Sequence, residues 1–204
     1  MTDVVDRVHT VAVTSPADGI ADPGPLGLAG FAMTTFFLSS YNAGLITGGE
    51  SVILGLALVY GGAAQLLAGM WEFRKGNTFG AVAFSSYGAF WISFWVLLTF
   101  SKDATSQSVG LYLLGWTIFT AYMTIAALRV SGAVLAVFVS LTITFVLLTI
   151  GKFATGNAAK DWTHIGGWFG FLTAILAWYA SFAGVTNSTF AKTVVPTWPL
   201  ANRT

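Results

Sequence analysis

Cysteine is absent from the sequence, and histidine and charged residues are scarce. Without cysteine, the chain can form no disulfide, no thiolate nucleophile and no cysteine-ligated metal site. Its two histidines, His9 and His164, lie far apart in the sequence, which argues against a histidine-rich metal centre. We therefore expect no bound metal and no cofactor.

Charge is the second shortage. Charged residues make up 8% of the chain, whereas soluble domains carry about 25%. Hydrophobic residues make up 55%, and the mean hydropathy is +0.75. A chain of 204 residues cannot bury this much apolar surface in its own core, so lipid must solvate much of it. The net charge of +1 also provides no basic surface for nucleic acid, so the composition predicts an integral membrane protein without a nucleic acid partner.

Six stretches without Asp, Glu, Lys or Arg have the length that a helix needs to cross a bilayer. They cover residues 26–46, 51–71, 78–100, 108–128, 131–150 and 162–186, and charged residues mark the breaks between them. We predict an all-α integral membrane protein with six transmembrane helices per protomer. Beside a transmembrane transport domain at 22–190, we expect a flexible N-terminal tail at 1–21 and a C-terminal tail at 191–204.

Lysine and arginine are unequally divided between the two sides of such a six-helix protein. The side of the two termini, the second-to-third loop and the fourth-to-fifth loop carries Arg7, Arg74, Lys75, Arg129, Lys192 and Arg203. The other side carries Lys102, Lys152 and Lys160. Because basic residues favour the cytoplasmic side, we expect both termini in the cytoplasm, in a multi-pass protein of the cell (inner or plasma) membrane.

The predicted spans contain polar residues, but none of them is Asp, Glu, Lys or Arg. Ion-coupled carriers usually keep an ionisable group at mid-membrane, and redox membrane enzymes need haem ligands or cysteines. We therefore do not expect an enzyme. The polar residues inside the spans include Thr35, Asn42, Gln65, Ser85, Ser86, Tyr87, Thr117, Thr120, Ser140, Thr142, Thr144, Thr173 and Tyr179. Such a lining suits a small polar solute, or a small anion held by hydroxyl and amide donors.

Two interpretations stay open for three of the polar residues. Gln65 and Asn42 either hydrogen-bond a neighbouring helix or face a transported solute, because an amide both donates and accepts. His164, near Asp161 at the mouth of the last span, is either an interfacial structural residue or a pH-sensitive gate.

The aromatic residues of the third span also have two interpretations. Aromatic side chains at helical spacing are usually packing or interface anchors. Tyr87 and Trp91, however, fall near the middle of the span at 78–100, where interface anchors do not sit. In Ser86-Tyr87-Gly88, hydroxyl-bearing side chains stand beside a glycine, whose backbone leaves space for a solute. This arrangement favours a constriction in a solute pathway.

Several motifs follow one another along the chain. Asp22-Pro23-Gly24-Pro25-Leu26-Gly27-Leu28 opens the first span, and Pro25 suits a first helical turn. The other motifs are Met33-Thr34-Thr35, Tyr60-Gly61-Gly62-Ala63-Ala64-Gln65, Lys75-Gly76-Asn77-Thr78-Phe79-Gly80, Ser86-Tyr87-Gly88-Ala89-Phe90-Trp91 and Gly156-Asn157-Ala158-Ala159. The series covers nearly all of residues 22–196 and resembles the acetate uptake transporter (AceTr) family, whose signature reads Asn-Pro-Ala-Pro-Leu-Gly-Leu. The chain departs from that signature at Asp22 and Gly24, and Asp22 puts a negative charge near the expected anion entrance.

The resemblance implies a homo-oligomer, a hexameric ring of six-helix protomers, with one pathway in each protomer. By motif position it implies a hydrophobic constriction of Phe31, Tyr87 and Leu141, and a small residue at Ala177 that helps set substrate size. It also implies an entrance at Asp22, Pro23, Gly24, Pro25, Leu26 and Gly27. Together with the polar residues above, the expected pathway residues are Phe31, Thr35, Asn42, Gln65, Tyr87, Trp91, Leu141 and Ala177.

Three functions remain to be separated. The resemblance favours membrane transport of acetate and related short-chain carboxylates, succinate among them. This transport is either channel-like or proton-linked, because a proton can travel on the carboxylic acid itself. The alternative is a pore for a small neutral solute such as ammonia or water, which also needs no intramembrane charge. A structural membrane protein, whose polar residues merely join helices, is the third.

Overall fold

A computed structural model describes residues 19–200, and the regular elements in this range are helical apart from one isolated bridge. They are α1 (Gly24–Asn42), α2 (Glu50–Leu58), η1 (Val59–Ala64), α3 (Gln65–Lys75), α4 (Thr78–Phe100), α5 (Ser106–Ala127), α6 (Gly132–Phe153) and α7 (Gly156–Thr189). α2, η1 and α3 form one continuous rod, Glu50–Lys75, so the described part of the chain contains six rods. The parts of the predicted tails at 1–18 and 201–204 lie outside the described residues.

Five of the six rods are long and apolar enough to cross a membrane. The remaining rod, α1, has 19 residues and buries Thr34, Thr35, Ser39 and Ser40. At about 1.5 Å per residue it still spans roughly 28 Å, close to the thickness of a bilayer's hydrocarbon core. The predicted all-α membrane fold is confirmed.

Two rods extend well beyond the spans that the sequence predicts. The second continues past residue 71 to Lys75 and is followed by Gly76, whose φ of +78° is typical of the residue after a helix C-terminus. α7 begins at Gly156 rather than at 162 and runs for 34 residues, which is about 51 Å of helix. Part of α7, which carries the exposed Lys160 and Asp161, must therefore extend beyond the hydrocarbon core.

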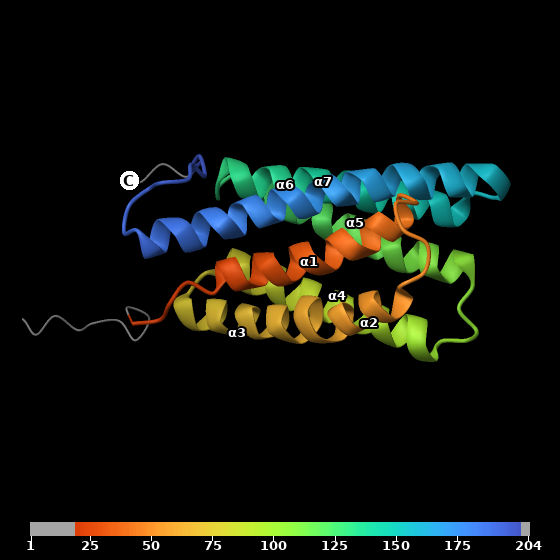
Figure 1. Ribbon diagram of the computed structural model, residues 1–204, viewed down its shortest axis with the longest axis horizontal. Coiled ribbons are helices and arrows are strands. Elements are labelled where there is room, and N and C mark those ends of the chain that lie inside the picture. Colours follow the sequence, from red (N-terminus) through yellow and green to blue (C-terminus); the bar gives the residue numbers. More distant parts are fainter. Residues whose placement is uncertain (1–18, 201–204) are drawn as a thin grey trace, which may run out of the picture.

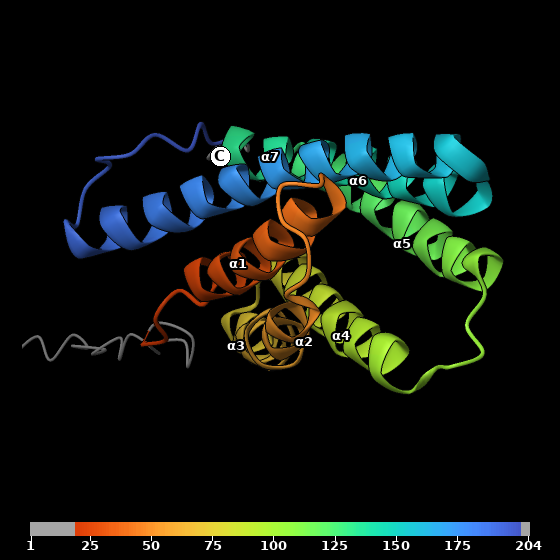
Figure 2. The same cartoon turned by 45° about the vertical axis from the view of Figure 1, so that its right-hand side comes forward.

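α1 lies between two groups of helices (Figures 1 and 2). On one side it packs along α7, α7 packs along α6, and α6 packs along α5. On the other side α1 packs against η1 and α3, and these pack against α4. The start of α1, the α3–α4 turn, the α5–α6 turn and the end of α7 lie at one end of the bundle, hereafter the N-terminal end (Figure 1). The three remaining turns lie at the opposite end.

The π-helix η1 brings the second rod very close to α1. An ideal Cβ at Gly30 would lie 2.6 Å from the carbonyl oxygen of Tyr60, so only glycine allows this approach. The Thr34 hydroxyl donates to the Gly30 carbonyl at 3.0 Å and lies 3.4 Å from the carbonyl oxygen of Leu56. The Thr34 side chain thus lies at the point where α1 and the second rod approach most closely, and its hydroxyl is satisfied there by backbone carbonyl oxygens.

Aromatic side chains fill the space between α4 and α5, whose backbones approach each other at few places. The Phe90 ring centroid lies 5.1 Å from that of Trp116 and 5.9 Å from that of Tyr112. The Tyr87 and Thr120 hydroxyls form a hydrogen bond of 2.9 Å. Large rings therefore bridge two helices that are consecutive in the chain but not in close backbone contact.

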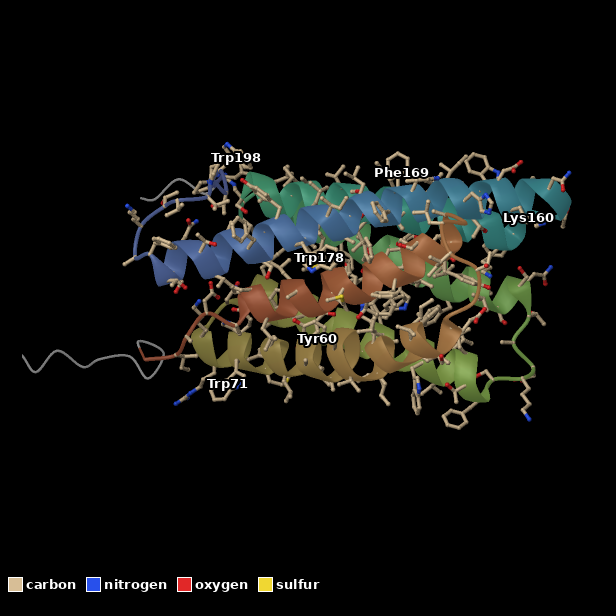
Figure 3. The ribbon with its side chains drawn as sticks, viewed as in Figure 1. Tyr60, Trp71, Lys160, Phe169, Trp178 and Trp198 are labelled. Carbon is tan, nitrogen blue, oxygen red and sulfur yellow. The ribbon has the colours of Figure 1, made fainter. Side chains whose placement is uncertain are left out.

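The outer surface of the bundle is apolar. Trp71, Ile118 and Ile125 are all exposed, and each would be costly to leave in water. Figure 3 shows Trp71 and Phe169 pointing away from the bundle, whereas Trp178 lies between α7 and α1. This distribution is what a protein solvated by lipid requires.

The segment after α7 folds back onto the N-terminal end of the bundle. The Gly132 N–H, at the start of α6, donates to the Trp198 carbonyl at 2.7 Å. The Tyr179 hydroxyl donates to the Pro196 carbonyl at 2.7 Å, and its ring stacks on Trp198 with centroids 6.0 Å apart. Carbonyl groups of this segment thus satisfy N–H groups that the first turn of α6 leaves without helical partners.

A central pathway as the candidate functional site

The interior of the bundle contains a narrow cavity at its N-terminal end, with a volume of about 190 Å³. Its walls come from the start of α1, from α3 and α4, and from α6 and α7. They comprise Asp22, Gly24, Pro25, Leu28, Phe31, Gln65, Glu72, Asn77, Phe79, Gly80, Ala83, Phe84, Tyr87, Val130, Val134, Val137, Phe138, Leu141, Ala180 and Gly184. The polar side chains in this wall are those of Asp22, Gln65, Glu72, Asn77 and Tyr87, and the remaining lining residues are aromatic, aliphatic or glycine.

A wide cavity of about 400 Å³ lies beyond it, toward the opposite end. Its walls come from α1, α4, α5 and α6, with one residue from α7. They comprise Phe31, Thr35, Leu38, Ser39, Tyr41, Asn42, Phe90, Trp91, Phe94, Leu97, Leu98, Ser101, Ala104, Val109, Tyr112, Leu113, Leu141, Thr144, Phe145, Leu148, Lys152 and Thr163. This cavity has hydroxyl groups along its length and one lysine at its outer end.

Phe31 and Leu141 line both cavities, which places them between the two. Tyr87 lines the narrow cavity, and its ring centroid lies 5.7 Å from that of Phe31. All three side chains are at most 5% exposed. The structure thus brings together, from α1, α4 and α6, the three residues that the family resemblance implies for a constriction.

A third hollow, which we call the mouth, continues the wide cavity to the surface at the opposite end. It has a volume of about 500 Å³ and shares Tyr41, Asn42, Lys152 and Thr163 with the wide cavity. Lys160 and His164 also line it, and Figure 3 shows Lys160 at this end of α7. The lining of the mouth contains no carboxylate, whereas the narrow cavity is lined by Asp22 and Glu72.

Three of the six residues of the predicted entrance motif line the narrow cavity, and the other three do not. Asp22, Gly24 and Pro25 line the narrow cavity, and Asp22 forms an ion pair of 2.8 Å with Lys75. The other members have different positions: Pro23 and Gly27 are buried, and Leu26 is exposed. Pro25 stands in the first turn of α1, as its missing N–H predicts.

Buried polar atoms without partners are concentrated on the cavity walls. Within residues 19–200, four buried side-chain atoms have no hydrogen-bond partner: Thr35 Oγ1, Gln65 Oε1, Ser85 Oγ and Trp91 Nε1. Thr35 and Trp91 line the wide cavity, and Gln65 lines the narrow one. Buried polar groups are normally satisfied, so unpaired atoms on a cavity wall are free to bind a solute or water.

Two predicted pathway residues complete the comparison with the sequence. Asn42 lines both the wide cavity and the mouth. Ala177 has no exposed surface and belongs to the packed core of α7, and it lines none of the three hollows described above.

Glu72 is the residue that reasoning from the sequence missed. The expectation that ionisable residues stay outside the spanning helices is wrong here, because α3 continues to Lys75 and Glu72 is 1% exposed. Its Oε2 accepts a hydrogen bond of 2.9 Å from the Asn77 side-chain amide. Gly76, preceded by two basic residues, is a helix C-terminus signal that would have placed Glu72 inside the helix.

Comparison with known protein families gives one match that spans almost the whole chain. Residues 7–202 match the GPR1/FUN34/yaaH family. The chain belongs to this family. The resemblance to acetate uptake transporters seen in the sequence is therefore confirmed.

Three relatives from a bacterium and two fungi illustrate the similarity. The succinate-acetate/proton symporter SatP of Escherichia coli (strain K12) is 42% identical over 182 residues, which cover 87% of this chain and 95% of that protein. Acetate permease A of Emericella nidulans is 42% identical, over 86% of this chain and 65% of its own. Ammonia transport outward protein 2 of Saccharomyces cerevisiae is 41% identical, over 85% of this chain and 64% of its own.

A solved structure of a member of the GPR1/FUN34/yaaH family has the same fold. The structure described as the bacterial acetate channel SatP superposes with a TM-score of 0.82 and 41% sequence identity, and covers 87% of this chain and 99% of that one. The relatives are transporters and a channel, and the chain is a multi-pass membrane protein like them.

Proposed function

We propose that this protein transports acetate and related short-chain carboxylates across the membrane, along one pathway in each protomer. The pathway runs from the mouth through the wide cavity, passes between Phe31 and Leu141, and leaves through the narrow cavity. The observation that carries the proposal is the position of Phe31 and Leu141, which line both cavities. The transport activities named for SatP and for acetate permease A support acetate as the solute.

The pathway residues suit a small carboxylate at low affinity. Lys152 and Lys160 at the mouth attract an anion, because charges that line a concave surface concentrate an oppositely charged solute. Farther in, hydrogen bonds from Thr35, from the Trp91 indole and from water must replace the hydration shell. These donors provide several weak sites rather than one tight site, and rapid conduction needs weak sites.

The constriction discriminates against the charged form of the solute. The Phe31, Tyr87 and Leu141 side chains present aromatic faces and methyl groups, which offer an anion neither a donor nor a positive charge. The single Tyr87 hydroxyl is bound to Thr120. A carboxylate therefore crosses this point most readily as the neutral acid, which makes transport proton-linked.

A pore for ammonia or water is the competing function. An apolar constriction suits a neutral solute as well as a protonated acid, and one relative is named for outward ammonia transport. The basic mouth favours the carboxylate, because it attracts an anion and repels ammonium, whereas it exerts no net charge attraction on neutral ammonia.

We further propose a hexameric ring of such protomers in the inner or plasma membrane, with both termini and the narrow cavity on the cytoplasmic side. The excess of basic residues at the N-terminal end of the bundle supports this orientation. The transport unit is 22–190, flanked by segments at 1–21 and 191–204, and it carries out no catalysis.

Uptake of labelled acetate by proteoliposomes tests the proposal. The purified protein should accelerate uptake above that of protein-free liposomes, and excess unlabelled acetate or succinate should compete, whereas ammonium chloride at the same concentration and pH should not. Uptake no faster than in protein-free liposomes would refute acetate transport. If the protein instead accelerates the swelling of proteoliposomes in ammonia or water gradients, measured by stopped flow, and does not accelerate acetate uptake, the alternative is established.

A further inference from the structure

Glu72 is a carboxyl group deep in the wall of the narrow cavity, and the proposed pathway has not yet used it. Its side chain is 1% exposed. Its Oε2 accepts a hydrogen bond from the Asn77 amide, and an ideal Cβ at Gly80 would lie 2.7 Å from its Cδ and 2.9 Å from its Oε1. Glycine at position 80 thus leaves the space that this carboxyl group occupies.

The charged groups around Glu72 do not neutralise it. Within residues 19–200 no lysine or arginine forms an ion pair with Glu72, and the nearby Lys75 is bound to Asp22 at 2.8 Å. Asp22 is the other carboxyl group on the cavity wall, and its side chain is 51% exposed. Asn77, from the turn before α4, is a neutral partner. The lining residues from α6 and α7 are all uncharged.

A carboxylate solute in this cavity creates a conflict of charge. The cavity is lined at one end by Gly24, beside Glu72, and at the other by Phe31, about two turns farther along α1, so a solute that crosses it passes the Glu72 carboxyl group. Two carboxylates confined together repel, and they bind one proton between them because the shared proton turns repulsion into a charge-assisted hydrogen bond. The arrangement therefore calls for one proton whenever the solute is present.

We propose that Glu72 is a proton-binding site of the transport cycle and exchanges its proton with the carboxylate solute. This inference rests on the proposed function. When the solute leaves the cytoplasm, the Glu72 carboxyl group has taken one proton from water at the N-terminal end. It transfers that proton to the solute carboxylate, so that neutral acid passes Phe31 and Leu141 and Glu72 remains as the carboxylate. In uptake the steps reverse: the acid gives its proton to the Glu72 carboxylate, the solute leaves as the anion, and Glu72 releases the proton to water.

The isosteric variant Glu72→Gln distinguishes two mechanisms. In the proposed one the solute receives its proton from Glu72, and in the other the acid is already protonated in solution before it enters. Without the exchangeable proton, the variant can carry only that preformed acid, whose concentration falls tenfold for each pH unit above the acid's own titration range. Labelled acetate exchange should be measured in proteoliposomes with equal pH inside and outside, from about pH 5.5 to about pH 7.5. We expect the flux of the variant, divided by that of the wild type, to fall by roughly tenfold or more across this range.

Two further variants serve as matched controls. Asp22→Asn removes the exposed carboxyl group of the same cavity, and its flux ratio to the wild type should not fall as the pH rises. Glu72→Asp keeps a titratable group, and its flux ratio should stay closer to constant than that of Glu72→Gln. A Glu72→Gln ratio that is constant or rises with pH would overturn the proposal, since Glu72 would then be a structural residue or a simple electrostatic barrier.

A measurement on the wild-type protein covers the case in which Glu72→Gln does not fold. Infrared difference spectra, recorded with ¹³C-labelled acetate so that its bands move away from those of the protein, should show a change in a protonated carboxyl band when acetate binds. The same change should occur in Asp22→Asn. Absence of any carboxyl change in the wild type would overturn the proposal. If the wild type shows no acetate flux at any pH, the proposed function itself fails, which is a separate result.

Discussion

Phe31 of α1 and Leu141 of α6 lie between the two central cavities, and each side chain forms part of both walls. Their side chains are 5% and 4% exposed, so the pathway is closed at this point by packing. The ring of Tyr87 completes the closure from α4, 5.7 Å from the Phe31 ring. We therefore expect these three side chains, rather than the volume of either cavity, to set the size of a solute that passes.

Shortening Leu141 should broaden the substrate range. Leu141→Val removes little volume, and Leu141→Ala removes more, so the flux of lactate relative to acetate should increase in that order. Truncation of a buried leucine to alanine costs about 2–5 kcal/mol of stability, so Leu141→Val is the safer variant. Competition of lactate against labelled acetate measures the effect.

The control for this experiment is Ile53→Val, which truncates a residue of α2 that is equally buried but lines none of the three hollows. It should leave the lactate-to-acetate ratio unchanged. The same ratio in wild type and in correctly inserted Leu141 variants would argue against the constriction.

Gln65 should contribute to solute binding in the narrow cavity. Its Oε1 has no partner within the described residues and can accept a hydrogen bond from the O–H of the protonated acid, and the side chain is 1% exposed on the cavity wall. Gln65→Ala should raise the acetate concentration at half-maximal flux and leave the oligomer intact on native gels. Should the oligomer dissociate in detergent instead, the amide joins helices and does not serve the solute.

Asp22→Asn should increase acetate flux at low ionic strength. Asp22 holds a negative charge at the end of the pathway, where it opposes an approaching anion, and salt should remove the difference because it screens exposed charges. The Asp22–Lys75 pair is partly exposed, with side chains 51% and 33% exposed, so its loss should cost no more than about 1 kcal/mol of stability. Flux recorded at low and high salt, with thermal unfolding in parallel, checks both statements. A flux gain that salt does not reduce would contradict the electrostatic explanation.

Net acetate flux in the wild type should rise as external pH falls toward the titration range of the acid. We expect the constriction to favour the neutral form of the solute. Low pH increases the fraction of solute in that form, both in solution and beside Glu72. Uptake at about pH 5.5 should exceed uptake at about pH 8 at a fixed total acetate concentration, after subtraction of leakage in protein-free liposomes. Equal uptake at the two pH values would mean that the protein conducts the anion without a proton.

Much of the architecture follows from hydropathy, because a helix that crosses lipid must be apolar over a fixed length. The third span, predicted at 78–100, is α4 with those same bounds. The charges that bound the spans were less informative. The charge of Glu72 predicts a span that ends at residue 71, yet the helix continues to Lys75 and buries Glu72 between α1 and α4.

The candidate site could be predicted in part. The family resemblance implies Phe31, Tyr87 and Leu141 by motif position, and the structure brings them together. Phe138 also lines the narrow cavity, with its ring centroid 6.1 Å from that of Tyr87, but no local pattern distinguishes it from other aromatic residues in an apolar span. Which side of a helix faces a cavity depends on tertiary packing, so the sequence of one chain does not reveal it.

The central claim is that solute crosses within each protomer through the wide cavity, and the absence of native cysteine allows a direct test. Thr35→Cys places one thiol of nearly the same size on the cavity wall, and Thr155→Cys places one in the exposed α6–α7 turn outside the linings described. Acetate flux should be measured before and after treatment with a negatively charged, membrane-impermeant thiosulfonate, with labelling verified by mass spectrometry. The account predicts that labelled Thr35→Cys loses most of its flux while labelled Thr155→Cys keeps it. Full labelling of Thr35→Cys with unchanged flux would contradict the account and place the conduction path elsewhere.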